Sequence, residues 1–198
     1  HRGRAPLFGH VTGHVRAHPV LVEGQESLGA VDRHVGDSLL EGVPILELAE
    51  RWLRAHIPPA APSLRLVHGD YRLGNFIFDE AGLVAVLDWE LAHLGDPVED
   101  LAWLCVRAWR FGNDDLPAAG LGTREALIEA YREAGGPPVD LGALRFWEVL
   151  SNFKLALVFI SQARAYLDGA HPTVELASLG RRIAEPEAEL LTLMEDAG

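Results

Sequence analysis

Two oxygen-bearing side chains flank a predicted β-hairpin and have the spacing of a magnesium–phosphate site. Asn75 directly precedes the apolar run 76–78, and Asp88 directly follows the apolar run 83–87. The residues 79–82 between the runs are typical of a tight turn, so the pattern predicts an antiparallel hairpin. Because the start of one hairpin strand lies beside the end of the other, we expect Asn75 and Asp88 to converge. One or two such oxygens, together with substrate phosphates, commonly hold Mg²⁺.

Asp70 adds a third oxygen-bearing group to this end of the hairpin. It lies five residues before Asn75, on the loop that leads into the first strand. A carboxylate at that place can accept a proton from an attacking hydroxyl, or orient the hydroxyl. The residue types therefore predict chemistry on a phosphate group, with Mg²⁺ as the metal.

The sequence motifs of this segment resemble those of a known family. His68-Gly69-Asp70 followed by Asn75 matches the catalytic-loop pattern H-x-D-x-x-x-x-N of protein-kinase-like phosphotransferases. Three further short motifs are similar to the aminoglycoside phosphotransferase and choline kinase superfamily: Leu87-Asp88-Trp89-Glu90, Gly95-Asp96-Pro97 and Asp100-Leu101-Ala102. The resemblance is strongest to the branch whose kinase domains occur alone in bacteria or fused to acyl-CoA dehydrogenases. It runs from about residue 38 to the C-terminus.

The resemblance implies a role for each residue that matches the motifs. Asp70 would be the catalytic base, and Asn75 and Asp88 would bind the Mg²⁺ ions that bridge the phosphates of ATP. Asp100 would brace the catalytic loop through the backbone of that loop. The implied activity is transfer of the γ-phosphate of ATP to a hydroxyl group of a small molecule.

Further residues of the segment have more open interpretations. His68 fits a packed, hydrogen-bonded residue of the loop better than an acid or base, although it could contact substrate. Arg72 could contact substrate or a phosphate, or pair with a nearby acid. Glu90 could face the substrate or support residues that do; in choline-type kinases an acidic residue at this place is associated with a cationic substrate. Trp103 and Trp109 are interpreted first as core residues and second as walls of a substrate pocket.

The elements around these residues predict a mainly helical α+β fold, like the C-terminal lobe of a protein kinase. A small hairpin or sheet would carry the site and pack on about five to seven helices. Apolar residues at helical spacing after Pro44 predict an amphipathic helix, and residues 64–67 predict a short strand. The chain after Pro97 is predicted to be helical over four ranges: 99–111, 123–134, 140–167 and 173–194, the last kinked or interrupted by Pro186.

Two domains are predicted: residues 1–37 form an irregular segment of unclear role, and residues 38–198 form the kinase-like C-terminal lobe. The resemblance also implies a nucleotide-covering N-terminal lobe with a strand lysine before the catalytic loop. The only lysine, Lys154, follows Asp70 by 84 positions, and the chain begins at His1 rather than Met. We therefore expect the N-terminal lobe to be absent and the isolated chain to turn over ATP inefficiently.

Composition excludes several classes of function. With 17 basic and 29 acidic residues, the net charge is −12, which disfavours nucleic-acid binding. The single cysteine, Cys105, cannot form an intramolecular disulfide, so a cytoplasmic location is expected. The longest apolar run, 155–160, is too short to cross a membrane. His10, His14 and His18 would share a helix face, but nearby glycines and the lack of a further ligand disfavour a zinc site.

Alternatives to the kinase hypothesis remain at this stage. A metal-dependent phosphoesterase is suggested by Gly69-Asp70 and Gly74-Asn75, but such enzymes need a histidine where this chain has Phe76. A non-catalytic lobe that binds a ligand or partner is consistent with the expected absence of the N-terminal lobe. The acceptor is also open: the resemblance permits an aminoglycoside or another amino-alcohol, and equally a hydroxyacyl thioester. The sequence does not indicate an oligomeric state.

Overall fold

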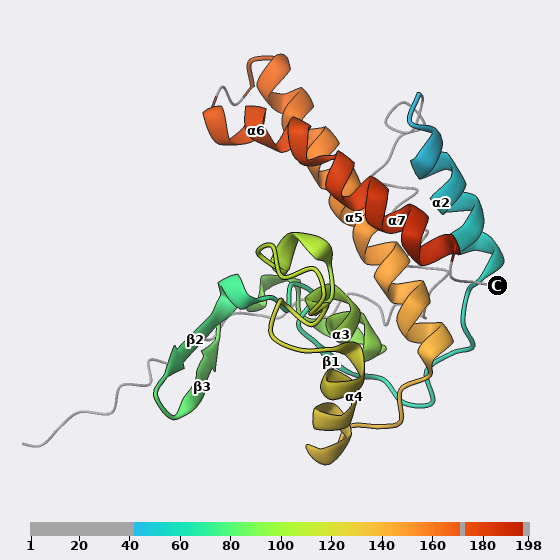
Figure 1. Cartoon of the computed structure of the whole chain (residues 1–198), viewed down its shortest axis with the longest axis vertical. Coiled ribbons are helices and arrows are strands. Elements are labelled where there is room, and N and C mark those ends of the chain that lie inside the picture. The colour runs from blue at the N-terminus through green and yellow to red at the C-terminus, as the bar shows by residue number, and fades with distance from the viewer. Residues whose placement is uncertain (1–41, 171–172, 196–198) are drawn as a thin grey trace, which may run out of the picture.

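The computed structural model describes residues 42–170 and 173–195, and within these it is mostly helical with two small sheets (Figure 1). The α-helices are α2 (Pro44–Ala55), α3 (Val98–Leu104), α4 (Arg124–Glu133), α5 (Leu141–Leu167), α6 (Val174–Arg182) and α7 (Ala184–Glu195). Three short 3₁₀ helices, η2 (Leu73–Asn75), η3 (Trp89–Leu91) and η4 (Arg107–Trp109), lie in the connections. The predicted mainly helical α+β class is thereby confirmed.

Helix α5 is the centre of the hydrophobic core. Most of its residues between 144 and 160 are buried, on all sides of the helix, because α2, α3, α6 and α7 pack around it. The large aromatic side chains of Phe146 and Phe153 are fully buried. A helix that is apolar around its whole circumference has this central position in a fold. Figure 1 shows α7 lying along α5, while the hairpin of β2 and β3 projects on the side away from α2.

Local sequence signals explain where several helices begin. Pro44 occupies the first turn of α2, where its missing N–H costs nothing. The side chain of Thr123 accepts the N–H of Ala126 at 3.2 Å at the start of α4. Asp140 accepts the N–H of Ala143 at 2.8 Å at the start of α5. These caps satisfy N–H groups that have no partner within the helix, so the predicted starts are confirmed.

The helix predicted over residues 99–111 is wrong in its second half, because α3 ends at Leu104. Val106 turns to an extended conformation with ψ 135° and is fully buried in a small cluster with Leu155 and Phe159. The carbonyl of Cys105, which a continuing helix would use internally, instead accepts the guanidinium of Arg110 at 2.7 Å. Burial of Val106 and Arg110 therefore outweighs the helical pattern.

The helix predicted over residues 173–194 is interrupted, as expected. Helix α6 ends at Arg182 and α7 begins at Ala184, which places Pro186 in the first turn of α7. Proline is tolerated there because first-turn N–H groups have no helical partner. No helix in the described part of the chain is both long and apolar enough to span a membrane.

Two antiparallel strand pairs position the loop of residues 68–75. Strand β1 (Arg65–Val67) pairs with β4 (His93–Gly95), and β2 (Phe76–Asp79) pairs with β3 (Gly82–Val86). The second pair is the predicted hairpin, with Phe76 opposite Val86. The loop leaves β1, enters β2 and contacts α3, so it is fixed from three sides.

Candidate active site

Asp100 of α3 holds the backbone of the loop. Its two carboxylate oxygens accept the N–H groups of His68 at 2.7 Å and of Gly69 at 3.0 Å. Burial raises the pKa of Asp100 above its usual value, and the two N–H groups offset only part of that rise. Gly69 has φ +84°, and a Cβ there would lie 2.8 Å from the carbonyl oxygen of Leu91. Position 69, whose N–H is one of the two that bind Asp100, therefore requires glycine.

His68 connects the loop to the residue before Asp88. The backbone N–H of Asp70 lies 3.1 Å from Nδ1 of His68, so Nδ1 must accept. Nε2 then carries the proton and donates to the carbonyl oxygen of Leu87 at 2.8 Å. The ring is 2% exposed, and both of its nitrogens are used within the protein. This placement corresponds to the structural interpretation of His68 rather than to contact with substrate.

The carboxylate of Asp70 accepts hydrogen bonds from three side chains. Trp103 Nε1 lies 2.8 Å from Oδ1, and Asn75 Nδ2 lies 2.8 Å from Oδ2. The Nε of Arg72 lies 3.1 Å from both oxygens. The guanidinium of Arg72 also stacks over the ring of Trp109, 5.1 Å from its centre. The Asp70 side chain is 19% exposed, so it remains accessible at the surface of the site.

Asn75 has a side-chain oxygen that this network does not use. Its Nδ2 donates both to the carboxylate of Asp70 and, at 2.8 Å, to the carbonyl oxygen of Asp70. These two acceptors fix the orientation of the amide, so Oδ1 points away from Asp70. The carbonyl oxygen of Asn75 accepts the N–H of Leu87 at 2.7 Å. Asp88, the residue after Leu87, therefore lies close to Asn75, as the hairpin predicts.

Asp88 is exposed and adopts a left-handed conformation with φ 65° and ψ 58°. This conformation is uncommon for a residue other than glycine, although Asp tolerates it better than most. Within the described residues, its carboxylate has no hydrogen-bond or ion-pair partner. A carboxylate and an amide oxygen on neighbouring residues of this hairpin end are the ligand types that suit Mg²⁺.

Among the described residues, no group of three or more His, Cys, Asp or Glu side chains could hold a metal ion. Mg²⁺ does not need such a group, because it keeps several waters and takes few protein ligands. The three histidines considered for zinc, at positions 10, 14 and 18, lie outside the described residues. Glu90 is exposed in η3 and makes no polar contact with the other site residues that the structure describes.

The sequence analysis did not predict the hydrogen bond that Trp103 makes. The spacing of Trp103 predicts a core residue first and a wall of a substrate pocket second, but its indole N–H donates to the carboxylate of Asp70. The available signal was its position three residues after Asp100 in a helix, which places both side chains on one face. A residue on the same helix face as Asp100 is well placed to contact the loop.

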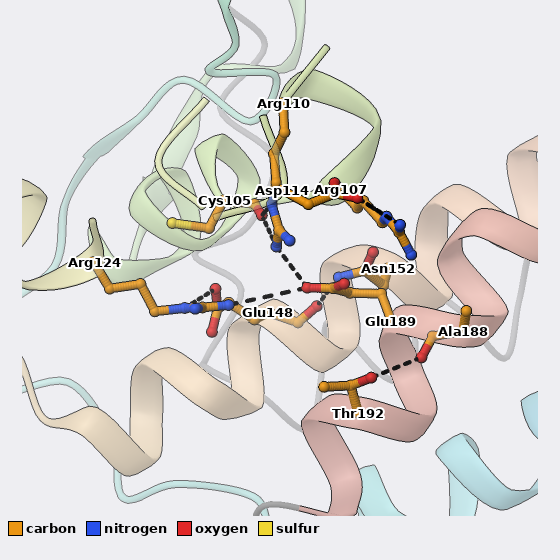
Figure 2. Close-up of polar contacts among 10 residues, drawn as sticks. All are labelled: Cys105, Arg107, Arg110, Asp114, Arg124, Glu148, Asn152, Ala188, Glu189 and Thr192. Carbon is orange, nitrogen blue, oxygen red and sulfur yellow. Dashed lines mark hydrogen bonds and ion pairs between the residues drawn. The ribbon is translucent and has the colours of Figure 1, made fainter. Parts of the chain in front are cut away.

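A buried ionic network anchors the segment between α3 and α4 that carries Trp109. Arg110 donates to Glu189 of α7 at 2.5 Å, and Arg124 donates to Glu148 of α5 at 2.7 Å (Figure 2). Burial raises the pKa of Glu148, and the nearby charge of Arg124 counters this in part. Burial also raises the pKa of the Cys105 thiol to about 12, so this cysteine is not an available nucleophile.

An apolar cavity of about 260 Å³ lies next to the site, between the β2–β3 hairpin and the segment before α4. Leu73 and Phe76, both within two residues of Asn75, line it. Leu121 and Leu127 also line it. The cavity therefore offers an apolar surface within a few residues of the polar cluster.

Comparison with known proteins points to one family. The model of the phosphotransferase enzyme family matches residues 13–147. The match begins within the first 37 residues, further toward the N-terminus than the motifs named above. Acyl-CoA dehydrogenase family member 10 of Mus musculus is 32% identical over 160 residues, which cover 75% of this chain and 15% of that protein. An aminoglycoside 3'-phosphotransferase of Salmonella typhimurium is 33% identical over 136 residues, covering 67% of this chain and 45% of that protein.

Solved structures agree with this result. A Ralstonia eutropha protein named as a candidate aminoglycoside phosphotransferase has a TM-score of 0.77 and 26% identity. The similarity covers 94% of this chain and 59% of that protein. A thermostable variant of an aminoglycoside phosphotransferase, solved with ADP and hygromycin B, has a TM-score of 0.54 and 16% identity, over 89% of this chain and 53% of that protein. At that identity the second likeness shows the fold alone.

Proposed function

The chain belongs to the phosphotransferase enzyme family, and from this membership we propose that it carries the catalytic centre of a kinase-type enzyme. The reaction is transfer of the γ-phosphate of ATP to a hydroxyl group of a small molecule. The observation that carries the proposal is the cluster in which three side chains donate to the Asp70 carboxylate, while Leu87, the residue before Asp88, donates its N–H to the carbonyl oxygen of Asn75.

Asn75 Oδ1 and the Asp88 carboxylate are the groups that would hold Mg²⁺. When bound, the ion neutralises charge on the nucleotide phosphates and orients them. Asp88 follows the hairpin in a left-handed conformation, and the hydrogen bond from the N–H of Leu87 to the carbonyl oxygen of Asn75 keeps Asp88 near Asn75.

Asp70 would accept the proton of the acceptor hydroxyl as its oxygen attacks the γ-phosphorus. The new bond joins the acceptor oxygen to phosphorus, the bond to the β-phosphate oxygen breaks, and ADP leaves. Arg72 lies across both carboxylate oxygens, and its side chain is 31% exposed. It can therefore turn from Asp70 toward the transferred phosphate while Asp70 receives the hydroxyl.

The acceptor belongs to one of two chemical classes. An aminoglycoside or another amino-alcohol is favoured by the acidic side chain of Glu90, which is exposed and unpaired among the described residues. A hydroxyacyl thioester is favoured by the apolar cavity beside the hairpin, which could take an acyl chain. One relative is named as an aminoglycoside phosphotransferase and another as an acyl-CoA dehydrogenase family member, so both acceptor classes belong in the first screen.

The test is a phosphorylation assay on the full-length protein. Mg²⁺–ATP is supplied with an aminoglycoside, an amino-alcohol or a hydroxyacyl-coenzyme A thioester, and the phosphorylated product is identified by mass spectrometry. Asp70→Asn keeps the shape of the side chain but removes the base, and we expect it to lower turnover about 100-fold or more. Asp79→Asn, at the end of β2, is the matched control and should retain activity.

Turnover that is the same in Asp70→Asn as in the wild type would contradict the assignment of the base. Mg²⁺–ATP binding without transfer to any acceptor would instead favour a non-catalytic, ligand-binding role. Release of inorganic phosphate from an added phosphate ester would favour the phosphoesterase alternative. Each outcome is distinguished by the product that appears.

A further inference from the structure

Helix α3 contacts the loop at two points, one turn apart on the same helix face. Asp100 accepts the backbone N–H groups of His68 and Gly69, and Trp103 donates to the Asp70 carboxylate at 2.8 Å. An indole has a single N–H donor, and Trp103 uses it for Asp70. The same helix thus fixes both the backbone of the loop and the orientation of its carboxylate.

Trp103 is itself held in place by its neighbours. Its ring packs against the ring of Trp109, with the ring centres 5.9 Å apart, and against a buried cluster that includes Leu155 and Phe159. The segment that carries Trp109 is anchored to α7 by Arg110 (Figure 2). A side chain that is packed in this way offers its N–H at a fixed point.

The three donors to Asp70 differ in how they bind it. Trp103 and Asn75 each contact a different carboxylate oxygen, so together they restrict rotation about the Cβ–Cγ bond. Arg72 contacts both oxygens with one Nε, and its side chain is more exposed than that of Asp70. When Arg72 turns away to admit a hydroxyl, Trp103 and Asn75 still determine the direction of the carboxylate.

We propose that Trp103 is a positioning residue for Asp70, whose indole N–H holds the carboxylate in the orientation that accepts the hydroxyl proton. The inference rests on the proposed function and adds a residue to it. Misplacement of a reacting group by about 1 Å can lower a rate about 100-fold. Loss of this bond should therefore affect the chemical step, because Trp103 does not contribute to the groups that hold Mg²⁺–ATP.

The experiment compares two Trp→Phe variants of the full-length protein. Trp103→Phe removes the N–H and keeps an aromatic ring. Trp147→Phe is the matched control, because the Trp147 indole also donates to a carboxylate, that of Asp96 at 3.0 Å. With an acceptor that the wild type phosphorylates, we expect kcat of Trp103→Phe to fall about 10- to 100-fold. KM for the acceptor and the Kd for Mg²⁺–ATP should stay within about twofold, and the control should keep the wild-type kcat.

A second measurement does not depend on whether Trp103→Phe folds. In protein with ¹⁵N-labelled tryptophan, Asp70→Ala should shift the indole N–H resonance of Trp103 and leave that of Trp147 in place. An unmoved Trp103 resonance, or a kcat of Trp103→Phe equal to that of the wild type, would overturn the inference and leave the proposed function intact. A wild type that transfers no phosphate to any acceptor would overturn both.

Discussion

The ion pair between Lys154 and Glu99 should make a large, pH-dependent contribution to stability. Glu99 is 8% exposed, and its carboxylate lies 3.0 Å from Lys154 Nζ and 3.2 Å from His93 Nε2. Burial alone would raise the pKa of Glu99, but the charge of Lys154 and the hydrogen bond with His93 outweigh it and lower the pKa to about 2. Glu99 directly precedes Asp100 in α3, so this ion pair is next in sequence to the residue that holds the loop.

The sign and size of the effect follow from this pKa. A carboxyl group whose pKa is lower in the folded state stabilises the fold above its unfolded pKa, here 4.5, and the stabilisation is lost as the pH falls toward about 2. The difference between the unfolded and folded pKa values of Glu99 corresponds to about 3 kcal/mol of stability. The hydrogen bond with Glu99 raises the pKa of His93, despite some opposing burial, so the contribution of His93 is present below pH 6.5 and is lost as the pH rises through the folded-state pKa.

Lys154→Met removes the cation and keeps most of the side-chain volume. We expect the free energy of unfolding in urea to fall by about 3 kcal/mol at pH 7, because Glu99 is left buried without its main partner. The decrease in stability between pH 4.5 and pH 2 should also become smaller than in the wild type. Arg132→Ala breaks an exposed pair with Glu129 and should cost no more than about 0.5 kcal/mol. A Lys154→Met variant within 1 kcal/mol of the wild type at pH 7 would refute the reasoning.

Two further changes test the anchors of the site. Gly69→Ala places a Cβ 2.8 Å from the Leu91 carbonyl oxygen, at a backbone φ of +84°. We expect it to lower the free energy of unfolding by at least about 1 kcal/mol. An unchanged urea midpoint would count against this close approach. Glu189→Gln removes the charge that pairs with the buried Arg110 and should lower the free energy of unfolding by about 3 kcal/mol. Asp114→Asn changes an exposed pair and should lower it by about 0.5 kcal/mol or less. Equal losses of the two variants in thermal or urea unfolding would contradict the buried network.

Features that depend on neighbouring residues could be predicted from the sequence. The hairpin follows from two apolar runs and a turn, and its geometry brings Asn75 next to Leu87 and Asp88. The start of α5 follows from Asp140, whose side chain accepts a helix N–H. These signals lie within a few residues of the structure that they determine, so distant contacts do not change them.

Features that depend on distant contacts could not be predicted. Helix α3 ends early because Arg110 forms an ion pair with Glu189, which lies 79 residues later in the chain. The bond from Trp103 to Asp70 joins residues 33 positions apart, and the spacing of Trp103 in its helix is equally that of a core residue. The apolar pattern of α2 does not decide between Leu46 and Leu48 as the buried residue: Leu46 is fully buried and Leu48 is 42% exposed, because the packing against α5 selects the face.

The most direct test of the account is calorimetry of Mg²⁺–ATP binding to the wild type and to Asp88→Gly. Glycine removes the carboxylate and keeps the left-handed backbone without strain, so a change in binding reports on the ligand. Asp79→Gly, at the end of β2 in the same hairpin, is the control. The account predicts that the wild type and the control bind, and that binding by Asp88→Gly is at least about tenfold weaker, which is about 1.4 kcal/mol. Binding of wild-type strength by Asp88→Gly would contradict the proposed site.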